Sequence, residues 1–580
     1  MPVPHQGYSH PPCQTHEMEP LIDAAVSPIR ALTEPVVRCW QRWPRVLLTL
    51  GALLYVSVLV IWASNNSDKS IDDAKLSAVE EESLVPVRPL PSDELVPRRL
   101  QCVAWRATGR CRPNGPREPQ NDKKCSDTIV NDMSGFCEVE DIDTGERFRV
   151  MQRHCTSLKG NVKFRCSDSS AFVNYRFKGR AAVEKALDTG FSLPHVAERG
   201  QSPRDGIVMV VYPKLLASAY ATVRVLREVL NCRLPIEIWF HVDEIGNDFG
   251  LLAPLQQLAI FVGNVSFHPM YNPRAKVFLS KVFAIYNSHF ERVLFLDADN
   301  VPTRDPTFLF ASPEFQANGA VFWPDFWHPR RTLFNLQARS MLWELLDIPF
   351  VDMFEQESGQ LLVDRSWHAA PLELVYFYAF HEPNFIEKLE VVYGDKDLFR
   401  LAWIKLKASF HMIDALPAMA GRSINGSFCG MTMVQHDAVG EILFLHRNQH
   451  KLTGERDEEL EKAAADNPVI SPENALGAPQ PDGYPDPVIW THLLSFRKDA
   501  NRKFYTIDAY RAAPQFPQSQ PCYGKRYVEK QKLFELQELA NFSFAGIETD
   551  IRHFAMEAAK LRHAQATARV GEQSTNFTRD

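Results

Sequence analysis

The middle of the chain alternates short apolar runs with longer stretches of helical periodicity. Apolar runs at Gly206–Tyr212, Ile236–Val242 and Val293–Leu296 are bounded by charged or turn-forming residues, a pattern typical of buried strands. Helices are predicted between them, at Leu215–Leu230 and from about Ala275 to His289. Strands that alternate with helices form βαβ units, so the pattern predicts an α/β fold with a mainly parallel sheet flanked by helices.

Weaker signals extend this pattern along the rest of the chain. Further strand-like runs are Phe267–Pro269, Gly319–Phe322, Leu361–Val363, Met431–His436 and Glu441–Leu445. Further helical stretches are Glu373–Leu389, Leu398–Leu406, Tyr527–Leu539 and Ile551–Ala566. The charged, proline-bearing stretch Lys451–Pro487 is typical of an exposed loop.

One apolar segment near the N-terminus has the length of a membrane span. Val46–Ala63 carries no charge and would cover about 27 Å as a helix, enough for a bilayer core. It begins too late and runs too long for a cleaved signal peptide. Cations precede the segment and acids follow it, at Arg38, Arg42, Arg45, Asp68, Asp72 and Asp73. The positive-inside rule therefore predicts a single-pass type II membrane protein with its C-terminal part in the lumen or outside.

The composition along the chain predicts its division into parts. Residues 1–45 form a disordered cytosolic tail, 46–63 a transmembrane signal anchor and 64–99 a proline-bearing stalk. A small Cys-rich module follows at 100–177, and the catalytic α/β domain covers 205–451. An exposed loop is expected at 452–487 and a C-terminal helical extension at 488–580.

Cysteines and glycosylation sequons agree with an oxidising, lumenal environment. Six of the 11 cysteines lie in the module, at Cys102, Cys111, Cys125, Cys137, Cys155 and Cys166. We expect them to pair as disulfides within the module, leaving Cys232, Cys429 and Cys522 to the catalytic part. Zinc binding is the alternative, but no C-x-x-C pair occurs. The N-x-S/T sequons are Asn65, Asn264, Asn425, Asn541 and Asn576.

The overall composition narrows the class of function. With 45% hydrophobic and 11% aromatic residues, the chain has ample material for a core. A net charge of −7 argues against general nucleic-acid binding. The Cys-rich module is interpreted as a disulfide-stapled spacer; the alternative is glycan binding through Trp105, Arg106 and Arg112.

The candidate chemistry lies at the end of the strand Val293–Leu296. Asp297 and Asp299 are one residue apart, so they share a face at the strand's end, where a divalent cation could bind. The alternative is that one aspartate turns the chain and the other caps the next element. Lys281 upstream and Arg304 downstream are cations that could contact a diphosphate there; each could also be a solvated surface charge.

Several motifs in order resemble one family. The stretch KVFAIYNSHFERVLFLDADNVPTRDPTFLF, with GIVMVVY and LPIEIWFHVDE before it, resembles the fungal-type α-mannosyltransferases of glycosyltransferase family 71. ESGQLLVD, GDKDLFRLAW and FLHRNQHK follow in that family's order, so the resemblance covers about Gly206–Lys451. It implies a GT-A (nucleotide-diphospho-sugar transferase) fold, Golgi residence, GDP-mannose as donor, retention of anomeric configuration and Mn²⁺ as cofactor.

A more distant likeness to retaining family-8 glycosyltransferases implies roles for single residues. Asp297 and Asp299 would hold Mn²⁺ against the donor diphosphate, and His446 would supply the third protein ligand. Asp395 would hydrogen-bond the donor sugar. Lys396 stands where that family usually has Gln, and Glu357 replaces the usual Asn, so the roles of these two residues stay open. Either Asp395 or Glu357 could serve as a nucleophile if the reaction were a double displacement.

The leading prediction is a Golgi type II α-mannosyltransferase that transfers mannose from GDP-mannose to a glycan or glycoprotein acceptor. The first alternative is a retaining transferase that uses a UDP-hexose. The second is a non-catalytic, lectin-like membrane protein built on the Cys-rich module. An intact set of Asp297, Asp299 and His446 favours an enzyme over the lectin-like protein.

Overall fold

The computed structural model describes residues 87–91, 97–196, 204–246, 249–458, 461–462, 480–512, 516 and 521–576. The predicted tail 1–45, anchor 46–63 and most of the stalk 64–99 lie outside these residues. Within them, no helix is both long enough and apolar enough to cross a membrane. The chain from Pro86 onward forms one compact unit.

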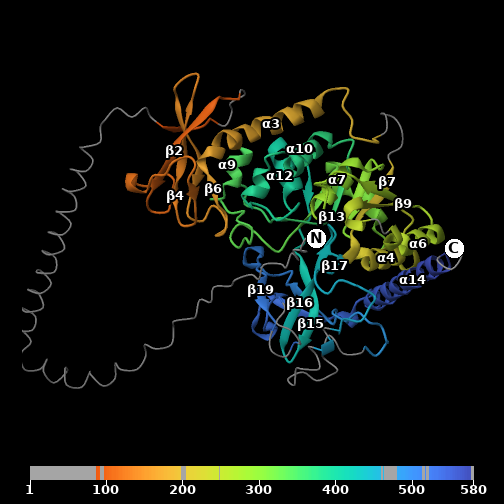
Figure 1. Cartoon of the computed structure of the whole chain (residues 1–580). Coiled ribbons are helices and arrows are strands. Elements are labelled where there is room, and N and C mark those ends of the chain that lie inside the picture. The colour runs from red at the N-terminus through yellow and green to blue at the C-terminus, as the bar shows by residue number, and fades with distance from the viewer. Residues whose placement is uncertain are drawn as a thin grey trace, which may run out of the picture. The chain divides into compact units, whose positions relative to one another are not determined.

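A seven-stranded sheet is the centre of this unit (Figure 1). Its order is β14-β12-β13-β10-β7-β8-β9. The strands are β7 (Asp205–Val211), β8 (Ile236–His241), β9 (Val265–Met270), β10 (Arg292–Leu296), β12 (Ala320–Pro324), β13 (Gln356–Asp364) and β14 (His411–Met412). Only β13 runs antiparallel to its neighbours, β10 and β12. The predicted α/β class with a mainly parallel sheet is therefore confirmed.

Helices cover both faces of this sheet because its strands are apolar on both sides. Val208 and Val210 of β7 pack with helices α7 (Leu279–Asn287) and α10 (Ala369–Phe380). Ile207 and Met209 alternate with them and pack on the other face with α4 (Leu216–Arg224) and α14 (Ile547–Asn576). This two-sided burial explains why the strands read as continuous apolar runs in the sequence.

A second sheet is built from the C-terminal half of the chain. Its main order is β11-β17-β16-β15-β18-β21, and β20 joins β19 to β16. The strands are β11 (Asn300–Pro302), β15 (Ala418–Ile424), β16 (Ser427–His436), β17 (Ile442–His446), β18 (His492–Phe496), β19 (Asp508–Arg511), β20 (Pro521–Gly524) and β21 (Phe534–Glu538). Because β11 follows directly on the Asp-x-Asp turn, this sheet is joined to the end of β10.

The prediction that residues 488–580 are a helical extension is wrong for its first part. Tyr527–Leu539, expected as a helix, holds a short 3₁₀ turn at Val528–Lys530 and then strand β21. Strand β21 pairs with β18 at five residue pairs, and this long-range pairing decides the structure of the segment over its local helical pattern. The second predicted helix, Ile551–Ala566, lies within α14 as expected. The predicted loop 452–487 is described only at its two ends, and the other predicted boundaries stay predictions.

The Cys-rich module is a small four-stranded sheet, β1-β5-β4-β2, with a two-stranded β3-β6 pair. The strands are β1 (Arg88–Pro89), β2 (Leu100–Thr108), β3 (Thr128–Ile129), β4 (Ser134–Asp141), β5 (Arg147–Arg153) and β6 (Phe164–Arg165). Its six cysteines form the disulfides Cys102–Cys125, Cys111–Cys155 and Cys137–Cys166. The predicted pairing within the module is confirmed. A fourth disulfide joins Cys429 to Cys522, and Cys232 is buried and unpaired in the described chain.

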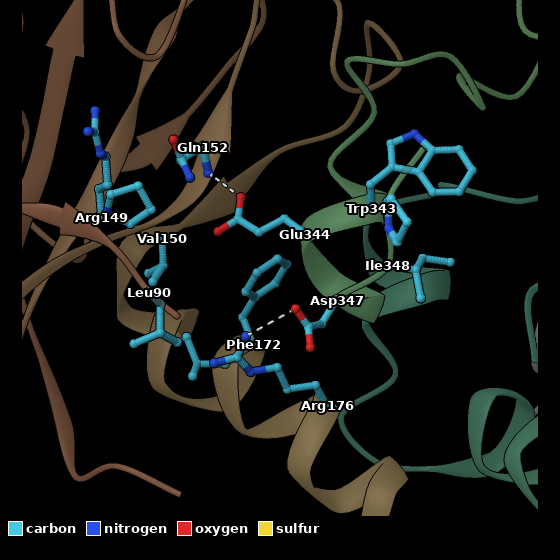
Figure 2. Close-up of a pocket in the computed structure, with 13 residues that line it drawn as sticks. Leu90, Arg149, Val150, Gln152, Phe172, Arg176, Trp343, Glu344, Asp347 and Ile348 are labelled. Atoms are coloured by element: carbon cyan, nitrogen blue, oxygen red, sulfur yellow. Dashed lines mark hydrogen bonds and ion pairs between the residues drawn. The ribbon is translucent and has the colours of Figure 1, made fainter. Parts of the chain in front are cut away.

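Helix α3 (Ser169–Leu187) leads from the module to the catalytic part and packs on α10. Beside it, α9 (Leu342–Leu346) extends Glu344 toward the edge of β5, as Figure 2 shows. The Glu344 carboxylate accepts hydrogen bonds from the backbone N–H groups of Met151 (2.7 Å) and Gln152 (2.8 Å). These contacts border a pocket of about 460 Å³ between the module, α3 and α9.

Candidate functional site

The two aspartates lie in a tight turn where β10 ends. The backbone N–H of Asp297 donates to the carbonyl of Gly359 on β13 (2.9 Å), and the N–H of Asn300 donates to the carbonyl of Asp297 (2.9 Å). From the neighbouring helix α4, the hydroxyl of Thr222 donates to the carbonyl of Ala298 (2.8 Å). The turn is thus fixed from both sides. Asp299 is buried, whereas the side chain of Asp297 is 25% exposed and can meet a ligand.

His446 reaches these carboxylates through the second sheet. In the antiparallel pair of β11 and β17, Asn300 lies opposite His446, which places the imidazole beside the turn. Its Nε2 is 3.4 Å from Oδ1 of Asp299 and 3.8 Å from Oδ2 of Asp297. Ligand atoms of the three residues all lie within 4.8 Å of one another. The predicted metal-ligating residues are therefore brought together, and their donor set could hold a metal ion.

Lys281 of α7 is buried beneath the same cluster. Its ammonium donates to the carbonyl of Ser358 (2.7 Å) and lies 3.3 Å from a carboxylate oxygen of both Asp297 and Asp395. Burial alone would lower the pKa of Lys281, but the surrounding carboxylates of Asp297, Asp395 and Glu357 raise it. The side chain is therefore a fixed positive charge at the site rather than a solvated surface lysine.

Glu357 and Lys396 form a second buried pair next to His446. The ammonium of Lys396 lies 2.8 Å from carboxylate oxygens of both Glu357 and Asp325. Burial would raise the pKa of Glu357, but Lys396 and His446 hold it well below its ordinary value. The other oxygen of Glu357 is 3.6 Å from Nδ1 of His446. Glu357 is thus an ionised neighbour of the histidine.

Asp395 is buried and lies 3.3 Å from the ammonium of Lys281, so it belongs to the same polar cluster. Burial raises the pKa of its carboxyl, although the ammonium of Lys281 opposes this effect. The three residues predicted as catalytic, Glu357, Asp395 and Lys396, all contact members of this cluster.

Arg304 does not join the cluster. Its guanidinium pairs with Asp437, at the end of β16, and lies over the ring of Phe308. Its position just after the Asp-x-Asp turn suggested a diphosphate contact, but β11 carries the chain away along β17 before Arg304 is reached. The structure therefore gives no support to Arg304 as a ligand-binding residue.

Lys451 is a member of the site that sequence reasoning missed. Its ammonium pairs with Asp299 and donates to the carbonyl of Arg447 (2.9 Å). Burial lowers the pKa of Lys451 to about 8, and the carboxylate of Asp297 opposes that fall. The residue closes the motif FLHRNQHK, so the same signal that pointed to His446 could have found it.

Other polar residues that were not predicted support the site from behind. The amide of Asn300 donates to Gly359 (2.8 Å) and to the side chain of Gln360 (2.7 Å). Asp397 accepts from the backbone N–H of Gln356 (3.0 Å) and from the guanidinium of Arg400 (2.7 Å). These bonds tie β13 to the Asp-x-Asp turn and to α12 (Leu398–Leu406). Asn300, Gln360, Asp397 and Arg400 lie within the motifs quoted above, but their supporting contacts arise only in the folded chain.

The arrangement suits a phosphorylated ligand at the carboxyl end of β10. Two carboxylates and an imidazole that could hold a cation lie there, next to the buried ammonium of Lys281 and the partly exposed ammonium of Lys451. Sugar-nucleotide transferases need such charges against a diphosphate leaving group. The class that fits these features is a glycosyltransferase.

Residues 204–437 match the protein family described as "Mannosyltransferase putative". The chain is 26% identical over 318 residues to the α-1,2-mannosyltransferase MNN21 of Candida albicans, covering 46% of this chain and 48% of that protein. It is 27% identical over 285 residues to the α-1,2-mannosyltransferase MNN2 of Saccharomyces cerevisiae, covering 42% and 47%. The resemblance to fungal mannosyltransferases is therefore confirmed. The chain spans about half the length of these relatives.

Solved structures that match part of the chain include the mannosyltransferase Ktr4p from S. cerevisiae in complex with GDP. It is 12% identical, covers 44% of this chain and 81% of its own, and has a TM-score of 0.26. The galactosyltransferase LgtC in complex with donor and acceptor sugar analogues is 14% identical, covers 36% and 72%, and also has a TM-score of 0.26.

Proposed function

We propose that this chain is an α-mannosyltransferase with a GT-A fold that transfers mannose from GDP-mannose to a glycan acceptor with retention of configuration. The names of the relatives favour an α-1,2 linkage. The observation that carries the proposal is the convergence of Asp297, Asp299 and His446 beside the buried ammonium of Lys281.

The proposed cofactor is Mn²⁺, held by Asp297, Asp299 and His446. Two carboxylates and an imidazole suit a divalent ion of this kind, and the ammonium of Lys451 already pairs with Asp299, so the carboxylate accepts a cation there. Such an ion would supply Lewis-acid stabilisation of the departing diphosphate.

The chain's own residues would place the reacting groups. Lys281 presents a fixed positive charge to the donor phosphates, and its bond to Ser358 prevents it from turning away. Asp395 would accept a hydrogen bond from a sugar hydroxyl. Lys396, held between Asp325 and Glu357, would orient that side of the sugar ring.

The reaction itself exchanges one bond at the anomeric carbon. The bond between C1 and the diphosphate oxygen breaks, and a bond between C1 and the acceptor oxygen forms on the same face. The acceptor's proton passes to the departing phosphate, so no protein base is needed. Glu357 is engaged by Lys396 and His446, which favours this front-face route over a double displacement through Glu357.

A donor panel tests the proposal. The full chain in detergent is incubated with Mn²⁺, a mannose-terminated acceptor and each of GDP-mannose, UDP-glucose and UDP-galactose, and the linkage of any product is determined. We expect transfer from GDP-mannose alone. Preference for a UDP-hexose would overturn the assignment of GDP-mannose as the donor. Glycan binding without transfer from any donor would favour the lectin-like alternative.

Asp299→Ala tests the cation site in the same assay. Losing 2–3 kcal/mol of charge stabilisation lowers the rate roughly 30- to 150-fold, and a metal contributes several kcal/mol, so we expect transfer to fall at least 100-fold. The melting temperature should change little, because the partly exposed ammonium of Lys451, which pairs with Asp299, can turn to solvent when the carboxylate is removed. Asp414→Ala, on an 82% exposed side chain, is the control. Near-parental turnover of Asp299→Ala with EDTA present would contradict the metal assignment.

The proposed location is the Golgi membrane, with Val46–Ala63 as the anchor and the catalytic part in the lumen. The described sequons Asn264, Asn425 and Asn541 are exposed, so glycan transfer could reach them. In microsomes, we expect the region after the anchor to be glycosylated and protected from added protease. Complete digestion from the cytosolic side would refute this topology.

A further inference from the structure

A cluster of Glu237, His268 and His289 lies toward the β8–β9 edge of the central sheet, whereas the candidate active site lies at the end of the central strand β10. Glu237 is the second residue of β8, His268 belongs to the neighbouring strand β9, and His289 lies in the connection from α7 to β10. We propose that these three side chains form a second metal site, for a borderline transition-metal ion of the Zn²⁺ class. This inference is independent of the proposed transferase activity.

The spacing of the ligand atoms fits a tetrahedral ion. Ligands about 2.0–2.1 Å from a tetrahedral Zn²⁺ lie roughly 3.3 Å from one another. Oε1 of Glu237 is 3.2 Å from Nδ1 of His289 and 3.9 Å from Nε2 of His268. The three ligand atoms all lie within 4.8 Å of one another. A small shift of His268, on the edge strand β9, would complete the three-ligand geometry and leave the fourth position to water.

The type of ligand atom selects the metal. Two imidazoles and one carboxylate form a ligand set that zinc sites use, whereas Mg²⁺ and Ca²⁺ prefer oxygen atoms. The carboxylate of Glu237 is buried, with only 2% of its side chain exposed. A buried carboxylate facing two imidazole nitrogens favours a cation at the point between them.

Neighbouring side chains already hold these ligands in place. The other oxygen of Glu237 accepts from the indole N–H of Trp239 (3.0 Å), and the ring of Trp239 stacks on His268 with centroids 4.8 Å apart. The buried guanidinium of Arg365 donates to the carbonyls of Ser288 (2.6 Å) and Phe290 (2.5 Å), on either side of His289. Outer contacts of this kind orient metal ligands and tune affinity.

One ligand atom makes only a poorly aligned contact without a metal. Nδ1 of His289 is buried and lies 3.2 Å from Oε1 of Glu237 without a hydrogen bond of good geometry, and that oxygen accepts instead from the backbone N–H of His289 (2.8 Å). Nε2 of His268 is hydrogen-bonded to the hydroxyl of Ser266 (2.8 Å). Ser266 is exposed, so this hydroxyl can turn to water when a metal takes its place. Metal binding would therefore give Nδ1 of His289 a ligand bond of good geometry, and it would cost the hydrogen bond between His268 and Ser266.

The site is separate from Asp297 and Asp299. Strand β10 lies between His289 and Asp297, and its five residues cover about 16 Å. An ion on Glu237, His268 and His289 would thus take no part in the transfer reaction. It would join β8, β9 and the start of β10, and so stabilise this edge of the sheet.

Metal titration of the full chain in detergent tests the proposal. After chelator treatment, Co²⁺ is added as a spectroscopic probe to the Asp297→Ala/Asp299→Ala double variant, which removes the other candidate site. We expect one equivalent of Co²⁺ with the intense visible absorption of tetrahedral coordination, displaced by Zn²⁺. Adding His289→Ala or His268→Ala should weaken binding at least 100-fold, and Glu237→Gln should also weaken it.

His563→Ala, whose side chain is 68% exposed on α14, is the matched histidine control and should bind Co²⁺ like the parent. In the Asp297→Ala/Asp299→Ala background, Zn²⁺ should raise the melting temperature with or without His563→Ala, but not when His289→Ala is added. A cooperative melting transition of His289→Ala near the parental temperature in the absence of metal shows that the variant folds. No stoichiometric binding, or binding that the three changes leave intact, overturns the site. Because the readout is metal binding, failure of the transferase proposal would not affect this result.

Discussion

Gly359 lies on β13 directly beneath the ring of His446. A Cβ atom at this position would lie 2.7 Å from Cε1 of that ring and closer still to Nδ1. No real Cβ approaches another atom so closely, so any larger residue must displace the histidine or the strand. The glycine of the motif ESGQ is therefore explained by the position of His446 rather than by a turn.

Gly359→Ala should lower transfer at least tenfold, because it moves His446 away from Asp299. The half-saturating Mn²⁺ concentration should rise for the same reason. Both quantities are measured by steady-state assay with varied Mn²⁺. Gly546→Ala, where a Cβ meets nothing within 4 Å, is the matched control and should behave like the parent. Parental Mn²⁺ dependence in Gly359→Ala would show that His446 does not bind the ion.

At the residue scale, sequence motifs pointed to the three candidate metal ligands but not to the residues that hold them in place. Asp297, Asp299 and His446 were found because their types and order matched known motifs. Lys451 pairs with an aspartate 152 positions earlier in the chain, a contact that only the folded sheet creates. Arg304 pairs with Asp437 instead of joining the cluster, because proximity in sequence does not fix the direction of a side chain.

At the scale of elements, the C-terminal helix supports the site from a distance. The carboxylate of Glu548, in the first turn of α14, accepts from the N–H groups of Ile489 (2.7 Å) and Trp490 (2.9 Å). It also pairs with the buried guanidinium of Arg447 (2.9 Å), the residue after His446. Helix α14 thus fixes the end of β17 that presents the histidine.

Glu548→Ala should lower the free energy of unfolding by about 3–5 kcal/mol, since it leaves Arg447 as an unpaired buried charge. We expect a clear fall in melting temperature and lower transfer per folded molecule. Glu557→Ala, on the same helix and in a partly exposed pair with Arg224, should cost about 1 kcal/mol or less. Equal effects of the two changes would argue against this role of Glu548.

The inner strands β7, β8 and β10 of the central sheet were predictable because each is an apolar run bounded by turn or charged residues, whereas the two-residue edge strand β14 was not predicted. The strands β18 to β21 were not, because their stability comes from pairing with partners remote in sequence. Phe534–Glu538 buries only one side chain fully and reads locally as part of an amphipathic helix. Long-range pairing decides such ambiguous segments.

At the scale of the whole unit, Glu344 connects the Cys-rich module with the catalytic part. Burial raises the pKa of its carboxyl to about 7, although the N–H groups of Gln152 and Met151 oppose this effect. In the unfolded chain the carboxyl ionises near its ordinary value, about 4.3. Between these two values the folded protein keeps a proton that the unfolded chain has released. Stability should therefore fall as pH rises from about 4.5 to about 7, and then stay constant.

Glu344→Gln tests this dependence. The difference in melting temperature between pH 5.5 and pH 7.5 should be smaller in Glu344→Gln than in the parent, by the equivalent of roughly 2 kcal/mol. Glu184→Gln, an exposed glutamate on α3, should keep the parental difference. An unchanged pH dependence in Glu344→Gln would show that this carboxyl is ionised in the folded protein throughout the range.

The pairing of Arg447 with Glu548 also has a consequence for the order in which the molecule is made. A ribosome releases Asp297 and Asp299 first, His446 much later, and Glu548 last of all. Until α14 emerges, Arg447 has no carboxylate to pair with and β17 has no fixed end. A nascent chain therefore carries Asp297 and Asp299 for a long stretch of translation before His446 has a fixed position, and the cluster becomes complete only after α14 has been synthesised.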